Sequence, residues 1–201
     1  MNGFTQANLF EEVNPSIENI EGLTYIPDFI TARQEADLIR IIDQQPWLTD
    51  LKRRVQHYGW KYDYTARRVD DSMRLDNLPD WLREYCNKLT SESHFSKLPD
   101  QVIINEYQSG QGIASHIDCV PCFEKIIASI SLGSPCVMDF THSKTNQKVS
   151  VLLEPRSLFV LSDDARYTWK HGIANRKTDK INGQSFSRSR RVSMTFRNVI
   201  L

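Results

Sequence analysis

The chain has 201 residues, of which 40% are hydrophobic and 25% are charged, and its formal net charge is zero. This size and composition fit a single compact domain and exclude the disordered class. No run approaches the ~20 apolar residues of a membrane-spanning helix, and residues 1–6 lack the basic and apolar segments of a secretory leader. Because four cysteines are ordinary usage, we expect a reduced, cytoplasmic setting without a membrane.

Charge is distributed unevenly along the chain despite the zero total. Residues 1–50 hold 2 basic and 9 acidic side chains, and residues 75–164 hold 7 and 12. Residues 51–74, by contrast, hold 7 basic and 3 acidic side chains, and residues 165–201 hold 9 and 1. Two basic segments on a neutral chain could form one positive face for a polyanion such as nucleic acid. The alternative is a solvated surface whose opposite charges lie nearby in the fold.

Two helices are expected in the first half of the chain. Thr31 and Gln34 have the spacing of a capping box, and apolar residues follow at helical intervals until Pro46 ends the pattern. A second helix is expected to begin near Pro79. Its apolar face comprises Trp81, Leu82, Tyr85 and Leu89.

Aromatic and basic side chains are combined in the segment between these helices, residues 51–75. The aromatic residues recur at every second position, which predicts a half-buried strand or hairpin. They are Tyr58, Trp60, Tyr62 and Tyr64, with Lys52, Arg53 and Arg54 before them and Arg67 and Arg68 after them.

Short β-type runs separated by glycine and proline begin at residue 101 and predict strands. They cover residues 102–107, 126–132, 136–140, 149–153, 157–161 and 192–199. Helices followed by strands indicate an α+β, mainly β fold with a barrel or sandwich core. We expect residues 175–190, which are polar and basic, to form a loop.

A candidate metal site begins with His116 and Asp118, which share one side of an extended segment because they are two residues apart. His171 follows 53 residues later. Two histidines and one carboxylate form the facial triad of non-haem Fe(II) oxygenases, which leaves coordination positions open for a co-substrate and oxygen. The alternative for any single histidine is a structural or surface role.

The run from Arg191 to Arg197 alternates polar and apolar residues, so both arginines share one face of a predicted strand. Asn105 and Tyr107 likewise share a face of an earlier strand. Arginines aimed into a core need anionic partners, and a dicarboxylate fits because guanidinium binds carboxylate through paired hydrogen bonds. A surface strand with two solvated arginines is the alternative.

Taken together, these motifs resemble the AlkB family of Fe(II)/2-oxoglutarate-dependent dioxygenases. The resemblance is strong over residues 100–199 and looser before them. It implies a double-stranded β-helix (jelly-roll) core with N-terminal helices and a nucleotide-recognition lid. We expect a single domain, residues 1–201, with an N-terminal helical extension over 1–50, the lid over 51–75, and a helix plus the jelly-roll core over 76–201.

The resemblance also implies a role for individual residues. It assigns Fe(II) to His116, Asp118 and His171. It assigns the co-substrate 2-oxoglutarate to Asn105, Tyr107, Arg191, Ser193 and Arg197, with Arg197 at the end nearer the metal. Substrate contacts are expected from Trp60, Tyr62, Tyr64, Arg67 and Arg68, where the aromatic rings would stack on an extruded base.

The activity implied is oxidative dealkylation of alkylated DNA or RNA bases by a monomer, with O2 consumed and succinate, CO2 and an aldehyde such as formaldehyde released. Many AlkB-type repair enzymes have an acidic residue where this chain has Val120, and often an asparagine where it has Ser193. Both differences are more typical of the branch that includes the wobble-uridine hydroxylases of tRNA. Hydroxylation of a modified wobble uridine is therefore one alternative. A non-catalytic nucleic-acid-binding module on the same fold is another.

A Cys-x-x-Cys pair, Cys119 and Cys122, follows the candidate metal ligands directly. A zinc site normally needs a second pair at suitable spacing, which the chain lacks. We expect free thiols beside the iron site.

Overall fold

The computed structural model describes residues 17–49, 51–181 and 183–201. Residues 1–6, for which the sequence predicts no secretory leader, lie outside these ranges. Among the described residues, no helix combines the length and the apolar character that crossing a bilayer requires.

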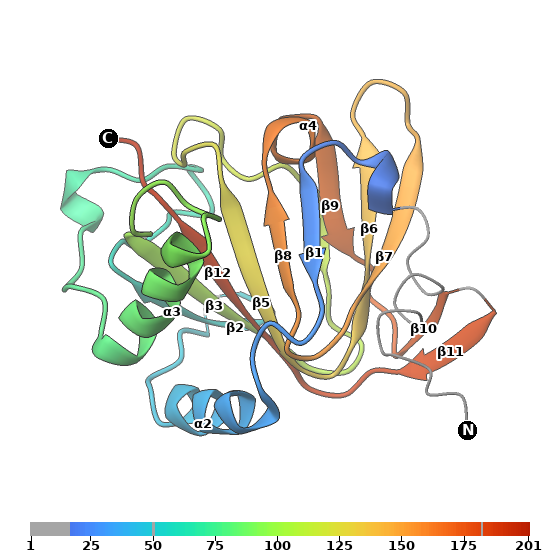
Figure 1. The fold of residues 1–201 in the computed structure, drawn as a ribbon, viewed down its shortest axis with the longest axis horizontal. Coiled ribbons are helices and arrows are strands. Elements are labelled where there is room, and N and C mark those ends of the chain that lie inside the picture. The colour runs from blue at the N-terminus through green and yellow to red at the C-terminus, as the bar shows by residue number, and fades with distance from the viewer. Residues whose placement is uncertain (1–16, 50, 182) are drawn as a thin grey trace.

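Two antiparallel sheets form the centre of the molecule (Figure 1), and the expectation of a mainly β, jelly-roll-type fold is confirmed. The larger sheet contains, in spatial order, β1 (Leu23–Ile26), β8 (Leu158–Leu161), β5 (Ile127–Gly133), β12 (Arg191–Arg197), β3 (Gln101–Tyr107) and β2 (Arg54–Tyr58). The smaller sheet contains β4 (Ile113–His116), β9 (Trp169–Ile173), β6 (Cys136–His142) and β7 (Lys148–Leu153). Short helices in the described residues are η1 (Ile17–Asn19), which precedes β1, and η2 (Asp71–Met73) and α4 (Asp163–Tyr167), which lie between strands.

Helices α2 (Ala32–Asp43) and α3 (Asp80–Ser91) pack against the larger sheet (Figure 1). The predicted capping box is present at Thr31, whose hydroxyl accepts the Gln34 N–H at 3.2 Å while the Gln34 side chain accepts the Thr31 N–H at 2.9 Å. Pro79 is the N-cap of α3, as expected. Both predicted helices are confirmed.

Strand β12 lies between β3 and β5, and all of its residues are buried. Its apolar residues belong to the core beneath α2 and α3. Its polar residues line a cavity on the opposite face of the sheet. The two faces therefore differ completely in chemistry, which fixes the register of the strand.

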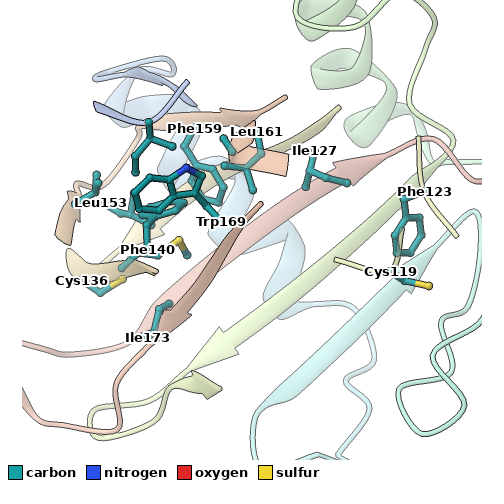
Figure 2. Packing of buried hydrophobic residues seen from close by; sticks show 14 of the residues in the cluster. Cys119, Phe123, Ile127, Cys136, Phe140, Leu153, Phe159, Leu161, Trp169 and Ile173 are labelled. Carbon is teal, nitrogen blue, oxygen red and sulfur yellow. The ribbon is translucent and has the colours of Figure 1, made fainter. Parts of the chain in front are cut away.

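A second core fills the space between the two sheets. Figure 2 shows Trp169 of β9 packed among Phe140 of β6, Phe159 of β8 and Leu153 of β7. These residues come from both sheets, so their burial holds the sheets together.

The segment 175–190, predicted to be a loop, instead forms a hairpin of β10 (Thr178–Ile181) and β11 (Gln184–Ser187). The cause is Asp179, which is fully buried. It accepts hydrogen bonds at 2.6 Å from both Arg188 and Arg176 and at 2.9 Å from the Val137 N–H. The loop prediction was wrong because this network depends on a distant strand.

The strand predicted from the aromatic alternation ends early. β2 stops at Tyr58, and Gly59 follows with φ +75°, where an added Cβ would lie 1.9 Å from the Asp100 carbonyl oxygen. The expected lid, residues 51–75, thus includes β2, and we keep the name lid for residues 59–75, which pair with one another. Lys61 N–H donates to the Met73 carbonyl at 2.8 Å, and Leu75 N–H donates to the Gly59 carbonyl at 2.9 Å.

Replacement of Asp179 by alanine is expected to lower the free energy of unfolding by about 3 to 5 kcal/mol, because Arg188 is left buried without its counter-charge. Chemical denaturation measures this loss. The matched control is Asp80→Asn, since the Asp80 side chain is 88% exposed and its loss should cost less than about 0.5 kcal/mol. Equal stability of the two variants would contradict the role assigned to Asp179.

Candidate active site

The structure brings the predicted triad residues together from β4, the segment after it and β9. His116 ends β4 and faces His171 of β9 as its register partner, while Asp118 follows two residues after β4. Their ligand atoms all lie within 4.8 Å of one another. This spacing suits a single metal ion.

Close approach of β4 and β9 at this point requires Gly172. A Cβ at that position would lie 2.8 Å from the Ser115 Cα and 2.9 Å from the Ser115 nitrogen. A larger residue would push the strands apart and separate His116 from His171. The sequence reasoning did not single out this glycine, although it directly follows a predicted ligand.

The hydrogen bonds and charges around the triad suit metal binding. His116 Nδ1 lies 2.8 Å from the Ala114 carbonyl oxygen, so Nδ1–H donates there and Nε2 is left for a metal. Burial lowers the pKa of His171 to about 4, which keeps this imidazole neutral. Burial alone would raise the pKa of Asp118, but the charge of Arg197, 2.8 Å away, holds it well below the usual range. Two imidazoles and a carboxylate form a donor set that fits Fe(II).

Arg166 of α4 organises the segment that carries Asp118. Its side chain is 1% exposed and forms no ion pair with any residue in the described part of the chain. Instead it donates to four main-chain carbonyls, those of Asp118 (3.0 Å), Cys119 (3.3 Å), Phe123 (3.2 Å) and Glu124 (3.3 Å). A single buried guanidinium therefore positions the whole turn after the metal ligand.

Cys119 and Cys122 form a disulfide within this turn, so the prediction of free thiols was wrong. The N–H groups of Cys122 and Phe123 both donate to the Cys119 carbonyl at 3.2 Å, and the turn places the two cysteine Cα atoms 5.3 Å apart. The sulfur atoms contact the Arg67 carbonyl oxygen of the lid at 3.2 and 3.4 Å. The disulfide thus lies between the metal site and the lid.

A narrow cavity between the sheets extends from the triad to Arg191. Arg191 is 3% exposed, donates to the Ser131 hydroxyl at 2.8 Å, and has its Nε without a hydrogen-bond partner among the described residues. Its guanidinium lies 5.6 Å from the centre of the Tyr107 ring. A buried cation with unused donors fits an anionic ligand.

The other predicted co-substrate residues line the same cavity. Ser193 and Arg197 project from the polar face of β12, and Arg197 is already bonded to Asp118. Asn105 uses its side-chain oxygen to accept Arg53 Nε at 2.8 Å. This bond connects the co-substrate cavity with a second one.

This second cavity, which we call the inner cavity, has a volume of about 360 Å³ and reaches His116 and Asp118 from the lid side. Tyr62 and Tyr64 form one wall, with ring centres 5.0 Å apart and planes at 87°. Phe123 lies 5.6 Å from Tyr62.

Positive charge borders the inner cavity. Arg53 lies 5.5 Å from the centre of the Tyr64 ring, and Arg67 donates to the Ile117 carbonyl at 3.2 Å. Neither forms an ion pair with a described residue. The carboxylate in the lining is Asp118, whose charge is shared with Arg197 and the metal position.

Not all predicted substrate residues reach this cavity. Tyr62, Tyr64 and Arg67 line it, whereas Trp60 is buried in the core between the sheets and Arg68 pairs with Asp70 at 3.3 Å. The sequence reasoning did not name Arg53 or Phe123 as site residues. Phe123 carries no motif of its own, and Arg53 was only one member of a basic cluster.

A sequence profile described as the 2OG-Fe(II) oxygenase superfamily matches residues 22–197, so the chain belongs to this superfamily, whose members use Fe(II), 2-oxoglutarate and O2. Named relatives within it are AlkB homologues, which confirms the resemblance seen in the motifs. The uncharacterized protein L905 of Acanthamoeba polyphaga mimivirus is 37% identical over 185 residues, covering 91% of this chain and 87% of the viral protein.

Two further relatives are longer than this chain. The alkylated DNA repair protein ALKBH8 homolog of Arabidopsis thaliana is 37% identical, covering 90% of this chain and 59% of that protein. The tRNA (carboxymethyluridine(34)-5-O)-methyltransferase alkbh8 of Xenopus tropicalis is 37% identical, covering 94% of this chain and 33% of that protein. The solved structure of OsALKBH1 shares the fold, with a TM-score of 0.67 at 17% identity over 88% of this chain and 96% of that one.

His57 lies beneath the lid, with Nε2 3.1 Å from the Tyr64 hydroxyl. Burial, assisted by the charge of Lys61, lowers the pKa of His57 to about 4. The unfolded chain therefore binds a proton at this residue near pH 6.5, whereas the folded chain does so only near pH 4. Protonation of His57 consequently favours the unfolded state at acidic pH.

The pH dependence of stability should therefore be shallower in His57→Gln. As pH falls from 7 to 4.5, His57 is expected to remove about 2 to 3 kcal/mol from the free energy of unfolding. Urea denaturation of both proteins at the two pH values measures the difference. An unchanged pH slope in the variant would show that His57 does not titrate in this way.

Proposed function

We propose that this protein hydroxylates an alkyl carbon attached to a base of DNA or RNA, so that an N-alkyl group is lost by oxidative dealkylation. The observation that carries the proposal is the inner cavity, which opens onto the triad between aromatic rings and unpaired arginines. AlkB homologues act on nucleic acids, as the names of the relatives state. One chain supplies all three metal ligands and the walls of the co-substrate and inner cavities, which supports a monomeric working unit.

The walls of the inner cavity suit a base that has left its stack. Tyr62, Tyr64 and Phe123 provide apolar surfaces on which a base can pack, and stacking on aromatic side chains accommodates any base. Arg53 and Arg67 are available for phosphate oxygens near the entrance. A base in this position places its substituents next to His116 and Asp118.

The substrate base would occupy the inner cavity, and 2-oxoglutarate would occupy the co-substrate cavity between the sheets. Fe(II) bound by the triad supplies, with 2-oxoglutarate and O2, the oxidation that replaces a C–H bond by C–OH, and succinate and CO2 are released. Arg191 holds the distal carboxylate of the co-substrate, beside Tyr107. A hydroxymethyl group on nitrogen leaves as formaldehyde and restores the base, whereas a hydroxyl on a carbon-bonded substituent remains.

Arg191→Gln is expected to raise the KM for 2-oxoglutarate by about 10- to 100-fold, because a charge-assisted pair of hydrogen bonds is lost. Metal affinity should not change. The control is Arg190→Gln, since the Arg190 side chain pairs with Asp43 and Glu106 instead of entering the cavity. Steady-state consumption of 2-oxoglutarate measures both, and an unchanged KM in Arg191→Gln would refute the assignment.

Charge in the inner cavity favours a second candidate, hydroxylation of a modified wobble uridine in tRNA. Arg53 and Arg67 make the wall positive, and Val120 stands where many dealkylating relatives have an acidic residue. A positive wall disfavours a cationic base such as N1-methyladenine and tolerates a neutral uridine. The name of the Xenopus relative, a tRNA carboxymethyluridine methyltransferase, agrees with a uridine substrate.

Mass spectrometry distinguishes the candidates. The protein is incubated with Fe(II), 2-oxoglutarate and ascorbate, and with either an N1-methyladenine oligonucleotide or a tRNA pool rich in modified wobble uridines. Loss of a methyl group with release of formaldehyde supports dealkylation, and gain of one oxygen on tRNA alone supports the second candidate. His116→Ala should abolish both reactions. No turnover of 2-oxoglutarate with any nucleic acid would favour a non-catalytic binding module.

A further inference from the structure

Tyr62 and Tyr64, which form a wall of the inner cavity, separate it from a further large cavity, which we call the outer cavity. This outer cavity has a volume of about 530 Å³, and Leu51, Tyr62 and Tyr64 line both it and the inner cavity. The two cavities are therefore separated by little more than a pair of aromatic side chains. A ligand that crosses this wall can occupy both.

The lining of the outer cavity combines apolar and polar side chains, and two of its leucines are exposed to solvent. Leu48 and Leu75 are 40% and 41% exposed, and Met73 also belongs to the lining. Large aliphatic side chains exposed around a concavity mark binding surfaces in soluble proteins. His57, which also lines it, is neutral at physiological pH because its pKa is lowered to about 4. Aromatic and aliphatic side chains thus form a large part of the lining.

One cation borders this surface. Lys61 is exposed, lines the outer cavity and forms no ion pair with a described residue. The acidic residue in the lining, Asp63, is compensated by Arg68 at 4.0 Å and by the N–H groups of Thr65 and Ala66. A cleft that combines aromatic and aliphatic side chains with a free ammonium complements a nucleotide, whose base is flat and whose phosphate is anionic.

We infer that the outer cavity binds the base next to the target base of a single-stranded nucleic acid, with Lys61 contacting the phosphate. The inference rests on the proposed function, since it requires a nucleotide in the inner cavity. The tyrosine wall then separates two consecutive bases, one presented to the metal site and the other held against Leu48 and Leu75. Recognition covers at least two nucleotides.

The test measures binding of fluorescein-labelled thymidine pentanucleotides by fluorescence anisotropy, with Mn(II) in place of Fe(II) to prevent turnover. In one probe all bases are present, and in the others the 5′ or 3′ neighbour of the central base, or both, are abasic. Loss of one stacked base is expected to weaken binding about tenfold. The abasic position that produces this loss identifies the direction of the strand.

Leu75→Glu and Leu48→Glu should each bind the intact probe about tenfold more weakly and no longer distinguish it from the abasic probe. The matched control is Leu98→Glu, because Leu98 is 53% exposed and lies outside both cavities. It should behave like the wild type. All three positions are exposed, so folding is expected to survive, and thermal unfolding verifies it.

Three results overturn the inference. If the wild type binds intact and abasic probes equally, or if Leu75→Glu and Leu48→Glu match Leu98→Glu, the outer cavity does not hold a base, while the proposed function stands. If no probe binds to any protein and no oligonucleotide or tRNA is hydroxylated, the proposed function fails as well. The two failures are therefore distinguishable.

Discussion

The structure depends on one strand, β12, whose two buried faces carry opposite chemistry. Its apolar face completes the core beneath α2 and α3, and its polar face supplies Arg191 and Arg197 to the cavity between the sheets. A shift of register by one residue would bury both arginines among aliphatic side chains, at a cost no domain of this size could absorb. The position of the co-substrate cavity thus follows from the same alternation that stabilises the larger sheet.

The metal site adds a second constraint, because its ligands lie far apart in sequence. Asp118 belongs to a turn after β4, and His171 belongs to β9 in the same small sheet. Arg166, five residues before His171, connects the two by donating to the carbonyls of that turn. Gly172 allows the strands to approach. Arg166 and Gly172 therefore position the metal ligands and do not themselves bind the metal.

Local patterns in the sequence were sufficient for much of this structure. The capping box at Thr31, the two helices, most strands of the larger sheet and the triad follow from spacing within a few residues or from motif resemblance. The hairpin β10–β11 was missed because it depends on Asp179 meeting Val137 across 42 residues. The roles of Arg166 and Arg53 were missed for the same reason, since their partners lie 42 to 52 residues away.

The lid differs from the rest of the active site in how its backbone is bonded. The main-chain hydrogen bonds of residues 59–75 mostly join lid residues to one another, whereas the metal ligands are embedded in the small sheet and its adjoining turn. Substitutions at exposed positions of the lid are therefore expected to leave the sheets intact. Selection can act separately on the surface that chooses the base and on the machinery that oxidises it, so one catalytic scaffold can diverge toward new substrates without loss of its reaction.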